Sequence, residues 1–287
     1  MKRVSNLPFG SVGLRVLALA FSASLAFAAA CFAQMGGGGS GGTNMDPRTS
    51  ISISNLLLDA NTSKATAPEE KAYKAFFDAR TASPDQRIRL GTDFVRKYPT
   101  SHYADSVYTG LVQAYYAKQD WNDFYGSAEV ALARNPDNVD VLAIVGWEIP
   151  HNYDPNDPDA EKKLGKAETY GKHALDVISA LSKPASMTEE QFAAAKADTL
   201  AETHSALGAV YFRRRQFDEA AKEFQLATNG PHPDPVDIYS LGVAFHNMER
   251  FSDAAEAFGK CAQIPGVLQD RCKQNADSMK KQASQLR

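Results

Sequence analysis

The chain has 287 residues, of which 44% are hydrophobic and 23% are charged, and its formal net charge is −3. This length and apolar content are enough for one or two cores, or for the continuous core of a repeat array. The negative balance and the lack of a Lys/Arg cluster argue against a nucleic-acid-binding protein. Its three cysteines, Cys31, Cys261 and Cys272, are too few for a disulfide scaffold and match no zinc motif.

The N-terminus predicts export. Lys2, Arg3 and Arg15 precede or open an apolar run that extends to Ala33, and no acidic residue occurs before Asp46. This arrangement is typical of a secretory signal peptide, here residues 1–33. Its removal leaves 28 cationic against 34 acidic side chains, a net charge of −6. We expect a mildly acidic exported protein.

Three fates of this signal peptide remain open. Cleavage after Ala33 would release a soluble periplasmic or secreted protein. Residues 28–31 loosely resemble a bacterial lipobox, although Ala28 stands where leucine is expected, so Cys31 is a candidate lipidation site. The third fate is an uncleaved anchor, because the apolar run is near the lower length limit of a membrane span. Only the last two fates would attach the protein to a membrane.

Residues 34–66 are predicted to be a linker. Residues 36–42 are all glycine or serine, a composition typical of a flexible tether with little to bury. Ile51 and Ile53 alternate with serines ahead of three leucines, and this short strand-like piece is left unassigned. The periodicity is helical from about residue 67, and we expect the folded array to occupy residues 67–287.

The first two helices are expected at Glu69–Ala82 and Asp85–Lys97, with Pro84 at the start of the second. A later hairpin is interrupted: Gly146 and Ala167 are 21 positions apart where the most regular hairpin has 12, so about nine residues are inserted, chiefly within Pro150–Asp159. A long helix should follow from about Met187 to Arg214. Thr188 and Gln191 have the spacing of a capping box at its start.

One pattern occurs twice at an offset of 34 residues, in residues 201–234 and 235–268. Gly208, Ala220 and Phe224 of the first copy correspond to Gly242, Ala254 and Phe258 of the second. This spacing resembles the tetratricopeptide repeat. The resemblance implies an all-α, right-handed solenoid of helical hairpins, in which each hairpin must stack on its neighbours to bury its apolar face. Residues 268–285 carry a polar outer face and are expected to form the C-terminal capping helix.

The hairpin that contains Trp121 departs from the family pattern. Val112 replaces the glycine and Phe124 replaces the small residue of the second helix, so close packing must be achieved differently there. The junction Tyr98–Ala104 is similar to one in periplasmic tetratricopeptide proteins that serve outer-membrane assembly and the Tol-Pal system. That similarity implies a bacterial cell-envelope protein.

Cys261 and Cys272 should face each other if the repeats stack as in the family. A disulfide between them is expected in an oxidising compartment. The alternative is that both are small buried residues that only pack.

The family's groove positions can be carried over to the first helix of each hairpin. They form an aromatic, weakly polar lining suited to an extended or helical peptide, and lack the Lys and Asn of members that hold a C-terminal carboxylate. The alternative is that several of these rings pack on a neighbouring helix or on the chain's own N-terminal segment. The predicted groove residues are Gln113, Tyr116, Trp147, Phe212, Tyr239, Val243 and His246.

Neither catalysis, a cofactor nor a metal ion is expected. The six histidines show no zinc spacing, and no nucleophile motif or phosphate-binding loop is present. The acidic insert 154–161 lacks the glycine of a calcium loop and contains Pro155 and Pro158.

Together these patterns predict an exported scaffold that holds a peptide segment of an envelope protein in a concave aromatic groove. The alternative is a structural subunit that assembles laterally or with itself, through the convex face or the insert at 150–160. Other proteins are the expected partners in both cases.

Overall fold

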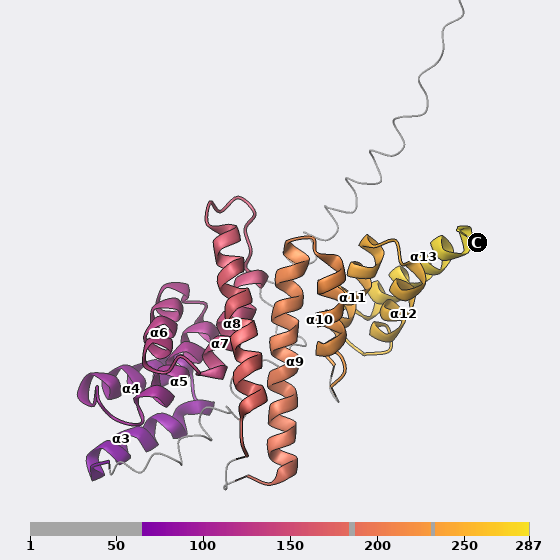
Figure 1. Ribbon diagram of the computed structural model, residues 1–287. Helices are drawn as coiled ribbons and strands as arrows, with labels where there is room; N and C mark the ends of the chain where they lie inside the picture. Colours follow the sequence, from indigo (N-terminus) through magenta and orange to yellow (C-terminus); the bar gives the residue numbers. More distant parts are fainter. Residues whose placement is uncertain (1–64, 184–186, 231–232, 287) are drawn as a thin grey trace, which may run out of the picture. The chain divides into compact units, whose positions relative to one another are not determined.

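A computed structural model describes residues 65–183, 187–230 and 233–286. Within these ranges every regular element is a helix (Figure 1). None of the described helices is both long and apolar enough to cross a bilayer. The predicted signal peptide 1–33, with Cys31, and nearly all of the predicted linker 34–66 lie outside the described residues.

The helices follow one another as hairpins, and consecutive helices pack together. The first helices of neighbouring hairpins also touch, α5 with α7 and α7 with α9. The prediction of an all-α solenoid of helical hairpins with a capping helix is therefore confirmed. In chain order the elements are α3 (Ala67–Asp78), the 3₁₀ turn η2 (Ala79–Thr81), α4 (Pro84–Lys97), α5 (Ala104–Lys118), α6 (Trp121–Arg134), α7 (Val139–His151), α8 (Ala160–Ala180), α9 (Glu189–Arg213), α10 (Phe217–Ala227), α11 (Pro235–Asn247), α12 (Phe251–Cys261) and α13 (Gln269–Gln285).

Two helix starts are set by local sequence. Pro84 is the first residue of α4, and the Ser83 hydroxyl accepts a hydrogen bond from the backbone N–H of Gln86 at 3.3 Å. Before α9, the Thr188 hydroxyl accepts from the Gln191 backbone, and the Gln191 side chain accepts from the Thr188 backbone. Each bond satisfies a donor that a helix start leaves without an intrahelical partner. The predicted capping box is confirmed.

The repeated glycines are explained by close approach of a phenylalanine ring. A Cβ atom on Gly208 would lie 2.7 Å from the ring of Phe224, and one on Gly242 would lie 2.7 Å from the ring of Phe258. Real Cβ atoms do not come so close, so the ring of the second helix can rest on the first helix only where the side chain is absent.

In the α5–α6 hairpin the large and small residues are exchanged between these two positions. Val112 stands at the glycine position, and Ala128 stands where the two regular repeats have Phe224 and Phe258. The bulk of α6 has moved to Phe124, which is fully buried, as are Val112 and nearly all of Ala128. The predicted departure from the family pattern is therefore an exchange of large and small residues that leaves the core filled.

Helix α7 continues through Pro150 to His151. The inserted residues were predicted chiefly within 150–159, and the first two residues of this stretch belong to α7. A proline in the last turn removes one backbone hydrogen bond but has no long helix after it to kink. The Pro150 carbonyl is itself used, since it accepts from Nε of Arg213 at 2.8 Å. The connection to α8 is then residues 152–159.

The C-terminal end is closed by α13. Cys261, the last residue of α12, is joined by a disulfide to Cys272 in the first turn of α13, with Cα atoms 5.7 Å apart. Both residues are fully buried. Asn275 of α13 also donates a hydrogen bond of 3.3 Å to the hydroxyl of Tyr239 in α11. The capping helix is thus attached to both helices of the last hairpin.

Candidate binding surface

Three of the predicted groove residues are buried. Gln113, Phe212 and Tyr239 expose 8%, 6% and 2% of their surface. The Gln113 side chain accepts from Nη2 of Arg87 at 3.1 Å, and the Phe212 ring meets the ring of Phe217 edge-on at 5.5 Å. Together with the Tyr239 hydroxyl contact to α13, these interactions hold neighbouring helices together. A direct contact of these three residues with a partner stays a prediction.

The other four predicted residues, Tyr116, Trp147, Val243 and His246, are partly exposed. The structure brings Tyr116 and Trp147 together, with ring centroids 6.2 Å apart and planes nearly perpendicular. Val243 and His246 lie on α11, where the His246 ring contacts the ring of Phe251 at 5.9 Å. Burial lowers the pKa of His246, which favours the neutral ring. The predicted set is therefore divided between two places.

Tyr116, Trp147 and His151 form what we call the aromatic platform. The Trp147 ring stacks on the His151 ring at 3.7 Å, with 14° between the planes. Nδ1 of His151 donates to the Trp147 carbonyl at 2.6 Å. Burial, with a smaller contribution from nearby Arg213, lowers the pKa of His151 to about 4, so the ring is neutral at pH 7. Sequence reasoning missed His151 because it placed this residue in the insert, although His151 follows Trp147 by one helical turn.

Three of the first helices also carry acidic residues. We call Asp140, Glu202 and Asp237 the acidic row, with one residue on each of α7, α9 and α11. Burial, and then the charges of Asp140 and Asp198, raise the pKa of Glu202 to about 8. Among the described residues no lysine or arginine forms an ion pair with Asp198, Glu202 or Asp237.

Asp237 of the acidic row accepts a hydrogen bond from the neighbouring first helix. The hydroxyl of Ser205 in α9, one turn after Glu202, donates to Oδ1 of Asp237 in α11 at 2.7 Å. Burial and the charge of Asp234 raise the pKa of Asp237 to about 8 despite this bond. The sequence alone does not reveal the importance of Asp140 and Asp237, because it depends on how the hairpins stack.

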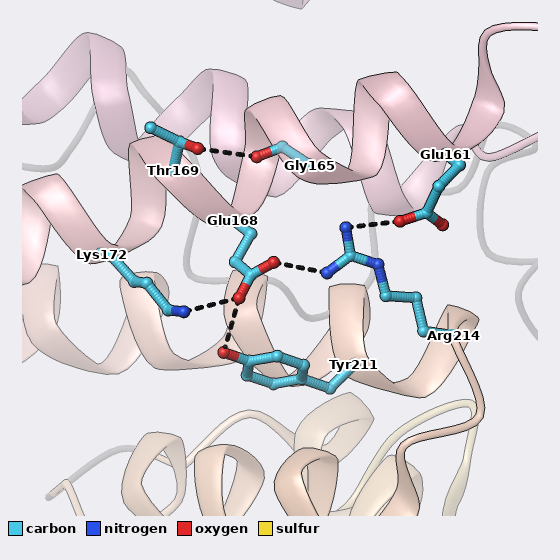
Figure 2. A network of polar contacts seen from close by, with 7 residues as sticks. All are labelled: Glu161, Gly165, Glu168, Thr169, Lys172, Tyr211 and Arg214. Atoms are coloured by element: carbon cyan, nitrogen blue, oxygen red, sulfur yellow. Dashed lines mark hydrogen bonds and ion pairs between the residues drawn. The ribbon is translucent and has the colours of Figure 1, made fainter.

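A second group of charges lies between α8 and α9 (Figure 2). The Glu168 carboxylate accepts from Nζ of Lys172 at 2.6 Å, from the Tyr211 hydroxyl at 3.1 Å, and from Nη1 of Arg214. Nη2 of Arg214 also pairs with Glu161 at 2.7 Å. Lys172 first, then Arg214 and Tyr211, lower the pKa of Glu168 to about 2. This ion-pair network attaches α8 to the end of α9, the helix that carries Glu202.

The surface as a whole offers aromatic faces and carboxylate acceptors. In the described part of the chain, no group of three His, Cys, Asp or Glu side chains is arranged to hold a metal ion. Rings and acceptors in a row along several helices suit the recognition of a polypeptide, since they provide apolar anchors together with polar contacts that fix orientation.

Comparison with known proteins adds little. No protein-family model matches the chain, and no curated protein matches it. Among solved structures, it is similar to the crystal structure of a thermophilic TPR protein from Thermus thermophilus, at 14% sequence identity and a TM-score of 0.48. That similarity covers 74% of this chain and 98% of the other. The assignment of the fold rests on the helical hairpins themselves.

Proposed function

We propose that this protein is an exported scaffold without chemistry of its own, which binds a peptide segment of a cell-envelope protein along the first helices α5, α7, α9 and α11. The aromatic platform is the observation that carries this proposal. Tryptophan and tyrosine are the residue types that most often dominate binding energy, and Trp147 and Tyr116 are partly exposed and fixed by ring contacts on a helical frame.

The acidic row gives the chemistry of the partner. A segment with a cationic side chain next to an aromatic or aliphatic one would place the cation beside Glu202 and the apolar group on Trp147. A cation beside Glu202 would favour the ionised form of this group against its raised pKa, and charge complementarity of this kind favours the correct partner and orientation.

Export is supported by two features. The N-terminal sequence is typical of a signal peptide. The disulfide between Cys261 and Cys272 is also of the kind that persists in oxidising compartments and is rare in the cytosol. Both features fit the periplasm or the outside of the cell.

Site-directed photo-crosslinking in intact cells tests the binding surface. A photoreactive amino acid at Tyr116 should give a discrete adduct with an envelope protein, and Trp147→Ala should abolish it while circular dichroism shows the helices intact. A second probe at Asn156, in the exposed insert, is the control for lateral contacts. Adducts from Asn156 with none from Tyr116 would overturn the proposal and favour a structural subunit that assembles through the insert.

A further inference from the structure

An apolar segment precedes the helical array. Residues 49–58 have no charged side chain and contain Ile51, Ile53 and three consecutive leucines, Leu56, Leu57 and Leu58. The isoleucines alternate with Ser50, Ser52 and Ser54, so an extended backbone would place the isoleucines on one face and the serines on the other. A segment of this composition gains by covering an apolar surface.

The segment is joined to the array by a short connection. Only nine positions separate Leu58 from Ala67, the first residue of α3. On its other side the sequence is rich in glycine over residues 36–42. The apolar segment is therefore held close to the folded array, where its effective concentration is on the order of millimolar.

The aromatic platform is within reach of this segment. The hydroxyl of Tyr73 in α3 lies 3.1 Å from that of Ser106 in α5, so α3 lies against the beginning of α5. Tyr116 lies further along α5, about 15 Å at the rise of an α-helix, and Ala67, where the connection begins, lies about 9 Å from Tyr73 along α3. Nine extended residues span about 30 Å. Leu56–Leu58 can therefore arrive at Tyr116 and Trp147 without any change in the helices.

We propose that residues 51–58 dock on the aromatic platform of their own chain and that Leu56–Leu58 cover the rings of Tyr116 and Trp147. The platform is an aromatic surface on a row of first helices, and the segment is a tethered, uncharged apolar peptide of the kind that such a surface accepts. Docking needs no other molecule. Its consequence, that a partner must displace the segment before it binds, rests on the proposed function.

Tryptophan fluorescence tests the docking in the whole exported chain, because Trp121 and Trp147 are its two tryptophans. In a Trp121→Phe background only Trp147 reports. Replacing Leu56, Leu57 and Leu58 together with serine should raise the acrylamide quenching constant of Trp147 about twofold, since an intramolecular contact at this effective concentration is largely formed. Replacing Ser50, Ser52 and Ser54 together with alanine is the matched control and should leave quenching unchanged.

These substitutions lie outside the described helices α3–α13, and circular dichroism verifies that a change in quenching is not a loss of the fold. Equal quenching in the leucine and serine variants would overturn the proposal. A difference that disappears on dilution would also overturn it, because the contact would then join two copies. No partner is present in this assay, so its failure leaves the crosslinking test of the binding surface untouched.

Discussion

Helix α9 borders two groups of carboxylates with opposite properties. At its end, Glu168 is surrounded by Lys172, Tyr211 and Arg214, and its pKa falls to about 2. In its middle, Glu202 lies near Asp140 and Asp198, and its pKa rises to about 8. Burial is the main cause for Glu202 and the like charges add to it, whereas for Glu168 the hydrogen bonds and ion pairs with Lys172, Arg214 and Tyr211 outweigh the effect of burial.

The comparison separates a region that stabilises the fold from one that can serve binding. The ion-pair network contributes stability at neutral pH, since the charged form of Glu168 is favoured in the folded protein. The acidic row costs stability at the same pH, because folding buries Glu202 and brings it close to other carboxylates. Groups with strongly shifted pKa values often lie at functional sites.

The largest effect is expected from Glu202→Gln. A raised folded-state pKa gives stability that is fully present below the unfolded value, near 4.5, and is lost as the pH rises through about 8. The substitution should therefore raise the free energy of unfolding at pH 8.5 by about 2–4 kcal/mol, with little effect at pH 4. Urea unfolding at both pH values measures this, with Glu189→Gln on the exposed first turn of the same helix as control. An equal effect at both pH values would contradict the charge explanation.

Glu168→Gln should have the opposite sign. The depressed pKa of Glu168 gives stability that is present above the unfolded value and lost as the pH falls toward 2. The variant should lose about 2 kcal/mol at pH 7, and its difference from the wild type should shrink between pH 5 and pH 2. Urea unfolding across this pH range is the measurement. A loss that does not depend on pH would mean that the side chain acts by packing alone.

Asp198→Lys would give Glu202 of the acidic row a cationic neighbour, as Glu168 has in the ion-pair network. Position 198 precedes Glu202 by one turn of α9, so the change removes a like charge and supplies an opposite one. A gain of about 1 kcal/mol in the free energy of unfolding at pH 8.5 is expected. Asp277→Lys, on the exposed face of α13, makes the same change of net charge elsewhere and should have less effect on the thermal midpoint. Equal gains from both variants would point to net charge instead of local pairing.

The smallest effect is expected from Glu161→Gln. Glu161 pairs with Arg214, but 72% of its side chain is exposed, against 21% for Glu168. Solvent screens such a pair, and the free energy of unfolding should change by less than about 0.5 kcal/mol. Thermal unfolding at low and high salt compares the two glutamates. A loss as large as that of Glu168→Gln would show that the network acts as one unit.

Much of the fold was predictable because local rules and the repeat agree. Gly208 and Gly242 mark where a ring must approach a helix, and Thr188 with Gln191 marks a helix start. The exception was Pro150, where the usual rule ends a helix but the structure extends α7 by one residue beyond it. Because of this difference, His151 was not among the predicted site residues.

The site was predictable only in part, because it depends on contacts between hairpins. Trp147 and Tyr116 could be chosen from their repeat positions, whereas the hydrogen bond that Tyr239 accepts comes from Asn275 of the capping helix. Glu168 and Arg214 are 46 residues apart, and no spacing rule connects them. Their meeting is decided by the packing of α8 on α9, on either side of a junction that the repeat pattern does not cover.

The disulfide makes the two ends of the array mechanically unequal. An array in which each hairpin is supported only by its neighbours can come apart from its ends. The Cys261–Cys272 bond keeps α13 attached to α12 even when their packing is disturbed, whereas α3 and the helices beside it contain no cysteine that could form such a bond. Under a pulling force the chain should therefore unravel from α3 inward. A partner bound near Tyr116 and Trp147 would then dissociate while the last hairpin is still folded.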